Sequence, residues 1–262
     1  MSAVTTNQLQ PSGEWNSLLS NKVVFVSGGG GYISQSIAHT CYLHGAKIIL
    51  ADINKQAALN VKQQILTQNK TIVVDDHDDD RILVVEVDVT NENSIKQAVD
   101  LGMSKWNKIN ILINTTAIFP MGTVEDITDE VWEKVLAINI KGMKQYSFSF
   151  LSFSLLLSLK GYALMAKHIV PIMKQQQESS AIINLASGSG MIAIPKSVPY
   201  PATKAAIIQM TKSLALDLGA HNIRVISVSP GPIGMARFHL KNCNVEAVVF
   251  DDLPINPIVT YA

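Results

Sequence analysis

The chain has 262 residues, of which 47% are hydrophobic, and its formal net charge at neutral pH is zero. A chain of this length and composition can bury a full core in one large α/β domain, which argues against disorder as its general state. Lys and Arg do not cluster with interleaved aromatic residues, so the composition argues against nucleic acid and favours a small-molecule ligand.

The two cysteines and the first residues bear on the cellular setting. Cys41 and Cys243 are too few for a disulfide framework. Residues 1–20 are polar and predict a flexible arm ahead of one domain at 21–262. They also lack the basic and apolar segments of a secretory signal. These features predict a cytoplasmic protein without membrane contact. The six histidines do not pair at ligand spacing with Cys or Glu, and no metal is predicted.

The predicted fold begins with an apolar run followed by glycines. Residues 23–27 form a continuous apolar, β-branched segment, which is typical of a parallel strand buried on both faces. Gly28–Gly31 follow, and an amphipathic helix is predicted to run to about His44. Glycines let the backbone approach a pyrophosphate closely, and the helix offers it free N–H groups and a positive dipole end. This unit predicts a dinucleotide site.

A second apolar strand at 47–51 ends at Asp52. A carboxylate at this distance from a glycine turn accepts hydrogen bonds from the adenosine ribose hydroxyls. The same charge repels a 2′-phosphate, and the adjacent Ile53 and Asn54 supply no cation to neutralise it, so Asp52 predicts NAD in preference to NADP. Taken alone, Asp52 is also compatible with a helix-capping role.

Strands and helices then alternate along the chain. Helices are predicted at about 54–69 and 91–104, a solvated acidic turn at 75–80, and strands at 82–87, 109–113, 181–186 and 223–228. The alternation predicts an α/β, Rossmann-type, doubly wound parallel sheet with helices on both faces, a three-layer αβα architecture. Ligands of such sheets bind at the carboxyl ends of the strands, where Asp88 and Asn114 fall.

Three side chains between residues 187 and 204 point to acid/base chemistry. Tyr200 and Lys204 are four residues apart in a predicted helix, so both lie on one helix face. An ammonium close to a phenol favours the phenolate and lowers the phenol pKa, which would make Tyr200 a general acid/base. Ser187, at the end of the 181–186 strand, can place its hydroxyl against the same substrate oxygen. A Tyr and a Lys at this spacing can also be a simple surface pair, so the context decides.

In this order, the motifs from about Lys22 to about Phe238 resemble those of the classical short-chain dehydrogenase/reductase family. The resemblance implies an NAD(P)-dependent oxidoreductase that interconverts a secondary alcohol and a carbonyl by hydride transfer, and a homo-oligomer. It implies that Asn139 is a proton-relay residue, that Ser187 orients the substrate and that Tyr200 is the acid/base. Lys204 would hold the nicotinamide ribose and depress the Tyr200 pKa.

The resemblance also implies where the cofactor binds. Asp88 and Val89 would contact the adenine ring, and residues 114–117 stand where the family has Asn-Asn-Ala-Gly. Tyr32 and Ser34 occupy the last two glycine positions of the usual family turn, which is a departure. The cofactor residues implied are Ser27, Gly28, Gly30, Gly31, Tyr32, Ile33, Asp52, Asp88, Val89, Asn114, Thr115, Thr116, Ala117, Tyr200, Lys204, Pro230, Gly231 and Ile233.

An unusual insert interrupts the family pattern after a helix predicted at 124–139. Lys141-Gly142 is followed by a Ser/Phe/Leu-rich tract, and Lys-Gly recurs at 160–161, where the pattern resumes. This bias is what a translated pyrimidine-rich tract would give, so we hypothesise that 143–161 is a retained intron or gene-model error. Detection of its peptides in the purified protein, together with its presence in mature messenger RNA, would refute this. The insert puts oligomerisation in doubt.

The end of the chain, from about 235 to 262, is atypical for the family. It shows no clear substrate-lid helices and no final family strand, although 245–250 has weak strand character. Alternatives to an active dehydrogenase therefore stay open. The chain can be a catalytically impaired nucleotide-binding protein of the same fold, or a product of aberrant splicing with no function of its own.

Overall fold

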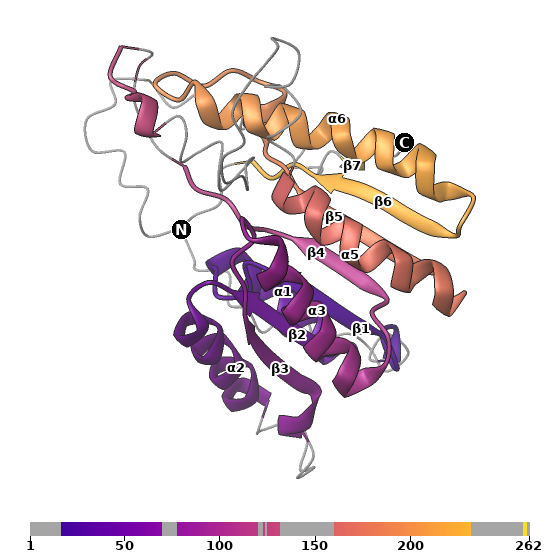
Figure 1. The fold of residues 1–262 in the computed structure, drawn as a ribbon. Coiled ribbons are helices and arrows are strands. Elements are labelled where there is room, and N and C mark those ends of the chain that lie inside the picture. The colour runs from indigo at the N-terminus through magenta and orange to yellow at the C-terminus, as the bar shows by residue number, and fades with distance from the viewer. Residues whose placement is uncertain are drawn as a thin grey trace, which may run out of the picture.

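The computed structural model describes residues 17–69, 78–119, 123, 125–131, 160–231 and 259–260. Strands in these ranges form one sheet in the order β3-β2-β1-β4-β5-β6-β7, and Figure 1 shows the sheet running from β3 at one edge to β6 and β7 at the other. The pairings from β3 to β6 are parallel. The predicted doubly wound parallel sheet is therefore confirmed.

The boundaries of the elements follow the predicted ranges closely. The parallel strands are β1 Val23–Ser27, β2 Lys47–Asp52, β3 Ile82–Glu86, β4 Ile111–Asn114, β5 Ser180–Leu185 and β6 Ile223–Val228. The helices are α1 Tyr32–Leu43, α2 Lys55–Asn69, α3 Glu92–Trp106, α5 Lys160–Gln176 and α6 Pro199–Gly219, with short 3₁₀ turns at Asp78–Arg81 and Gly188–Gly190.

Local sequence explains where α3 begins and ends. The side chain of Asn91 accepts hydrogen bonds from the backbone N–H groups of Asn93 and Ser94, which satisfies two of the free donors at a helix start. At the other end Asn107 adopts a left-handed conformation with φ of 55°, which asparagine tolerates better than most residues.

The two largest hydrophobic clusters of the described residues lie on opposite faces of the sheet. On one face, alternate strand residues such as Val24 and Leu50 pack against α1 and α2. On the other face, residues such as Phe25 and Ile49 pack against α3, α5 and the end of α6. Because successive strand residues point to opposite faces, a strand covered on both sides must be largely apolar, as β1 is from Val23 to Val26.

The tail, expected to lack the final strand of the family, contributes one short strand to the sheet. Residues Val259–Thr260 form β7, which pairs antiparallel with β6 through the partners Ser227 with Thr260 and Val228 with Val259. A two-residue strand carries too little periodicity to be recognised in a sequence. The possible strand at 245–250 lies outside the described residues.

The helix predicted to begin at Val124 starts later. Residues 125–128 form a turn, and helix begins at Asp129. Thr128 causes this start, because its Oγ1 accepts a hydrogen bond from the N–H of Val131 at 3.3 Å. Residues 132–159, with most of the predicted insert, lie outside the described residues. The second Lys-Gly pair opens α5, as the resumed family pattern predicted.

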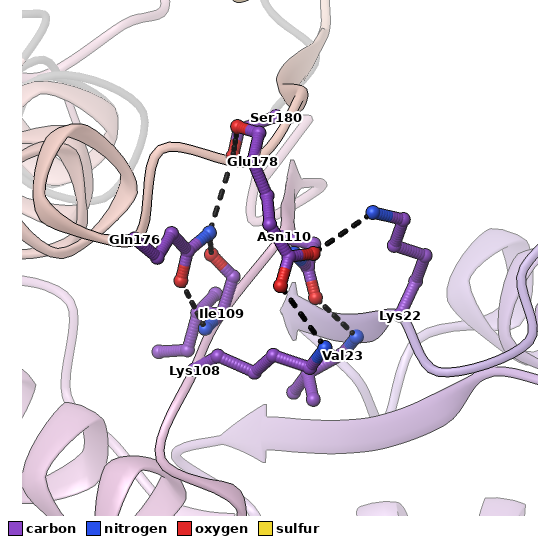
Figure 2. A network of polar contacts seen from close by, with 8 residues as sticks. All are labelled: Lys22, Val23, Lys108, Ile109, Asn110, Gln176, Glu178 and Ser180. Atoms are coloured by element: carbon purple, nitrogen blue, oxygen red, sulfur yellow. Dashed lines mark hydrogen bonds and ion pairs between the residues drawn. The ribbon is translucent and has the colours of Figure 1, made fainter.

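A polar network joins three strands at the amino-terminal edge of the sheet (Figure 2). Asn110, fully buried before β4, accepts a hydrogen bond from the N–H of Val23 at 3.0 Å and donates to Glu178 at 2.9 Å. Lys22 and Lys108 also contact the Glu178 carboxylate, at 2.9 and 3.3 Å, and these hydrogen bonds lower its pKa. One asparagine and one carboxylate therefore align the starts of β1, β4 and β5.

We expect Asn110→Ala to destabilise the fold by about 2 kcal/mol, because it leaves the buried N–H of Val23 without an acceptor. Urea unfolding followed by circular dichroism measures this loss. Lys96→Ala is a suitable control, since it removes only the exposed Lys96–Asp100 pair on α3 and should change stability by less than about 0.5 kcal/mol. Equal effects of the two variants would contradict the proposed importance of the network.

Candidate active site

The turn between β1 and α1 is shaped by glycines that have no room for a side chain. Gly28 has a φ of +79°, and a Cβ added there would lie 2.6 Å from Oγ1 of Thr115. A Cβ on Gly29 would lie 2.9 Å from the backbone of Leu50. The N-cap of α1 is Gly31, which provides no side-chain oxygen to the free N–H groups of this helix start. Such a turn leaves the helix terminus available to an anion.

Hydroxyl groups hold this turn against the end of β4. Ser34 donates a hydrogen bond to the carbonyl of Gly28 at 2.6 Å and lies 2.7 Å from the Thr115 hydroxyl. Thr115 in turn contacts the carbonyl of Ser27 at 2.7 Å, and the Ser27 hydroxyl lies 2.9 Å from that of Thr116. The polar residues that replace the usual glycine and asparagine therefore bond to one another.

A cavity of about 370 Å³ lies at the carboxyl ends of β1, β2, β3 and β4. This volume is in the range of small-molecule and cofactor sites. The residues that line it are Gly28, Gly31, Tyr32, Ile33, Ser34, Ala51, Asp52, Ile53, Val87, Asp88, Val89, Thr90, Thr115, Thr116, Ala117 and Ile118. Ten of the residues predicted to bind the cofactor are thus brought to one cavity, whereas Ser27, Gly30 and Asn114 are not among the residues that line it.

The two carboxylates predicted at the strand ends lie in this cavity wall. Asp52 accepts hydrogen bonds from the backbone N–H groups of Gly30 at 3.0 Å and Asn54 at 2.8 Å, so it also fixes the glycine turn. Asp88 accepts from the N–H and the hydroxyl of Thr90, at 2.8 and 2.7 Å. Each carboxylate oxygen can accept more than one hydrogen bond, so both side chains keep acceptor capacity toward the cavity.

Tyr200 and Lys204 occupy the first turns of α6. Lys204 is 1% exposed, and its Nζ donates a hydrogen bond to the carbonyl of Leu185 at 2.7 Å. This Nζ lies 5.6 Å from the centre of the Tyr200 ring. Phe119, which follows the cavity wall, contacts the same ring edge-on with centroids 4.5 Å apart. The segment after β4 thus connects the cavity to the tyrosine.

The expected effect of Lys204 on Tyr200 is wrong for this structure. Burial raises the pKa of Tyr200, and a hydrogen bond with Ser187 opposes this rise only in part. Burial also lowers the pKa of Lys204 to about 8. Desolvation of the phenol outweighs the Ser187 hydrogen bond, while the Lys204 ammonium is itself desolvated and donates to the Leu185 carbonyl.

Ser187 and the segment after β6 complete this end of the sheet. The Ser187 oxygen accepts hydrogen bonds from the N–H and the hydroxyl of Ser189, at 3.2 and 2.9 Å. The N–H of Gly188 donates to the carbonyl of Pro230 at 2.9 Å, which holds Pro230 and Gly231 beside the 187–190 turn. Asn139 and Ile233, also predicted as site residues, lie outside the described residues.

Two contributors to the site were missed by the sequence reasoning. Ser34 was noted only as a departure from glycine, although a hydroxyl at that position beside two threonines is a hydrogen-bonding signal. Tyr162 in α5 is 3% exposed, and its hydroxyl contacts the carbonyls of Thr116 at 3.2 Å and Leu185 at 3.4 Å. No sequence spacing links Tyr162 to either strand end.

Comparison with known proteins agrees with this fold and arrangement. The family model described as short chain dehydrogenase matches residues 22–155, and the one described as Enoyl-(Acyl carrier protein) reductase matches residues 149–242. The chain belongs to the short-chain dehydrogenase/reductase family and is an NAD(P)-dependent oxidoreductase of that family. Its predicted identity as a classical member is confirmed.

The chain is similar to curated relatives across most of its length. It is 30% identical over 224 residues to the "CLA biosynthesis dehydrogenase/reductase" of Lactiplantibacillus plantarum, covering 85% of this chain and 68% of that protein. It is 29% identical over 215 residues to the "Trans-4-hydroxycyclohexanecarboxylate dehydrogenase" of Sinomonas cyclohexanicum, covering 82% of this chain and 73% of that one.

Solved structures share the fold. A 3-ketoacyl-(acyl-carrier-protein) reductase from Brucella melitensis, complexed with NADH, matches with a TM-score of 0.66 at 24% identity, covering 81% of this chain and 76% of that one. A short-chain type dehydrogenase/reductase from Mycobacterium marinum matches with a TM-score of 0.68 at 24% identity, covering 81% of this chain and 75% of that one. Within the described residues, no helix is long and apolar enough to cross a membrane, and no group of three metal-ligating side chains occurs.

We expect Gly28→Ala to raise the Kd for NADH by about tenfold or more, because the left-handed φ and the contact with Thr115 together cost about 1.4 kcal/mol or more. Fluorescence titration with NADH measures the change. Gly219→Ala at the end of α6 is the matched control, since a Cβ there meets nothing within 4 Å and NADH binding should be unchanged. Wild-type affinity in Gly28→Ala would show that the turn does not hold the cofactor.

Proposed function

We propose that this protein interconverts a secondary alcohol and a carbonyl with NAD, using Tyr200 as the acid/base. The observation that carries the proposal is the arrangement at the carboxyl ends of β5 and β6. There a partly buried phenol is hydrogen-bonded to Ser187 and shares one helix end with a fully buried lysine. Buried titratable groups with shifted pKa values in one place are typical of catalytic sites.

The cavity beside β1 to β4 fits a dinucleotide. Gly28 to Gly31 would face the pyrophosphate at the uncapped start of α1, and Asp52 would accept from the adenosine ribose. Asp88 and Val89 would contact the adenine, while Thr115 to Ala117 form the wall toward the catalytic end. When bound, the nicotinamide supplies or takes up the hydride.

Asp52 supports NAD over NADP in this proposal. Its carboxylate lines the cavity and is held in place by the N–H groups of Gly30 and Asn54. Because this carboxylate is held in place, it cannot move away from the 2′-phosphate of NADP, and the two negative charges would repel each other. Among the residues that line the described cavity there is no Lys or Arg to offset it.

The raised pKa of Tyr200 suits the direction of carbonyl reduction. At neutral pH the phenol is protonated, so it can give its proton to the substrate oxygen as that oxygen gains negative charge. Ser187 can donate to the same oxygen, because its hydroxyl already lies beside the phenol. In alcohol oxidation the same groups act in reverse, and the phenol oxygen must first lose its proton.

The segment between Ser187 and Tyr200 suggests the kind of substrate. Met191, Ile192, Ile194 and Val198 are large apolar side chains that are between 37% and 59% exposed. Apolar surface beside a reactive pair favours a substrate whose body is hydrocarbon. The relative named for a hydroxycyclohexanecarboxylate supports the choice of alicyclic alcohols and ketones for assay.

Tyr200→Phe tests the proposal. We expect kcat with the best alcohol or ketone of this panel to fall at least about a hundredfold, since a general acid/base contributes that factor or more. The Kd for NADH should stay within about threefold of wild type, because the ring that packs on Phe119 is kept. Full activity in Tyr200→Phe would refute the assigned role. NADH binding without turnover in the wild type would favour the impaired nucleotide-binding protein instead.

Asp52→Asn tests the cofactor preference. We expect the ratio of NADH to NADPH affinity to fall about tenfold or more. The substitution removes the negative charge of Asp52 from the cavity wall, which lowers the repulsion of a 2′-phosphate. Asparagine keeps one carbonyl oxygen for the N–H of Gly30 but loses the second acceptor that Asp52 offers to the N–H of Asn54, so the ratio of the two affinities is compared and not either affinity alone. Parallel titrations with NADH and NADPH measure the ratio, and a wild type that prefers NADPH would contradict the assignment.

A further inference from the structure

Tyr162 occupies a buried position between the two halves of the site. It lies in the first turn of α5 and packs with Ala186, Ile207 and Ile208, so its ring joins the end of β5 to α6. Its hydroxyl is within hydrogen-bond distance of the Thr116 carbonyl at 3.2 Å and the Leu185 carbonyl at 3.4 Å. Thr116 belongs to the cofactor cavity wall, and Leu185 holds Lys204.

A phenol has one proton for these two acceptors. The hydroxyl lies within donating distance of both carbonyls, so its proton is shared between Thr116 and Leu185, with the shorter distance on the Thr116 side. Nζ of Lys204 donates to the same Leu185 carbonyl at 2.7 Å. The phenol oxygen, at 3.4 Å, and Nζ, at 2.7 Å, therefore both lie against the carbonyl oxygen of Leu185.

The neighbours of Lys204 make this hydroxyl important. The titratable groups that face its Nζ are Tyr200 from its own helix and Tyr162 from α5, and no described carboxylate forms an ion pair with it. Burial and the nearby Tyr200 raise the pKa of Tyr162, so this phenol stays protonated and acts only as a dipole. A buried ammonium without a counter-ion depends on such dipoles.

We propose that Tyr162 is a positioning residue that ties the cofactor wall at Thr116 to the catalytic lysine through the shared Leu185 carbonyl. It holds Nζ of Lys204 in place and helps to keep it charged, without touching substrate. The proposal rests on the function assigned to Lys204 and Tyr200 above. It assigns a role to a residue outside the Ser187, Tyr200 and Lys204 set, on a separate helix.

Tyr162→Phe removes the hydroxyl and keeps the buried ring. NMR of the protein labelled with ¹³C at the lysine ε position follows Lys204 directly, with Lys204→Met to assign its signal. The wild-type midpoint should lie near pH 8. We expect the midpoint in Tyr162→Phe to move to lower pH by about half a unit or more, because the Leu185 carbonyl that accepts from the ammonium is no longer held in place by the Tyr162 hydroxyl. This readout requires neither substrate nor turnover.

Kinetics of the same variant give the second readout. We expect kcat to fall about tenfold while KM for NADH changes less than about threefold, since misplacing a catalytic group by a fraction of an ångström slows the reaction more than it weakens binding. The alkaline limb of kcat should move to lower pH together with the Lys204 midpoint. Thermal melts confirm that each variant is folded.

Tyr42→Phe is the matched control. Tyr42 is also 3% exposed, but it lies in α1 within the core cluster on the other face of the sheet. It should change neither the Lys204 midpoint nor the alkaline limb of kcat. An unchanged midpoint in Tyr162→Phe, or an equal shift in Tyr42→Phe, would overturn the inference.

The outcome is separable from that of the proposed function. If Tyr200→Phe is inactive while Tyr162→Phe matches wild type in both readouts, the proposed function stands and the role of Tyr162 is refuted. If Tyr200→Phe is fully active while Tyr162→Phe still lowers the Lys204 midpoint, Tyr162 positions the lysine and the proposed chemistry is refuted.

Discussion

The site depends on a row of polar side chains at one register of the parallel sheet. Ser27 pairs with Asn114 and Asn114 with Asn184, and each is fully buried at the carboxyl end of its strand. Asn114 donates to Asn184 at 2.9 Å, and Asn184 donates to Thr211 of α6 at 3.0 Å. A slip of one residue would turn these side chains to the opposite face, so the hydrogen bonds specify the register.

This row also determines where α6 lies. Thr211 is anchored by Asn184 two turns after Lys204, and at the helix start Tyr200 contacts Phe119 beside the cavity wall. The ammonium of Lys204 is buried there without a carboxylate among the described residues. Burial lowers the pKa of Lys204 from 10.5 to about 8, so keeping this group charged destabilises the folded state by about 3 kcal/mol at pH 7. The fold tolerates this cost at a position where a cation is useful to chemistry.

The parts predicted well from sequence are those that short-range patterns determine. Apolar β-branched runs gave β1 and β6 their observed bounds, and the residues that follow the strands did gather at one sheet edge. Contacts between distant segments were not predictable in this way. Tyr162 reaches Thr116 across 46 positions, and Glu178 reaches Lys22 across 156. The predicted direction of the Tyr200 pKa shift also differs from the observed one, because residue spacing does not show how much hydration each group loses on burial.

The polar residues in the glycine turn show why a departure from a motif need not damage a site. Ser34 fills a position where glycine is usual, yet its hydroxyl bonds to the Gly28 carbonyl and to Thr115. Thr115 then occupies the space that a side chain on Gly28 would need, so the remaining glycine becomes obligatory. Hydroxyl hydrogen bonds thus fix the turn in this chain. This arrangement still presents N–H groups to a phosphate, because Gly31 leaves the start of α1 uncapped.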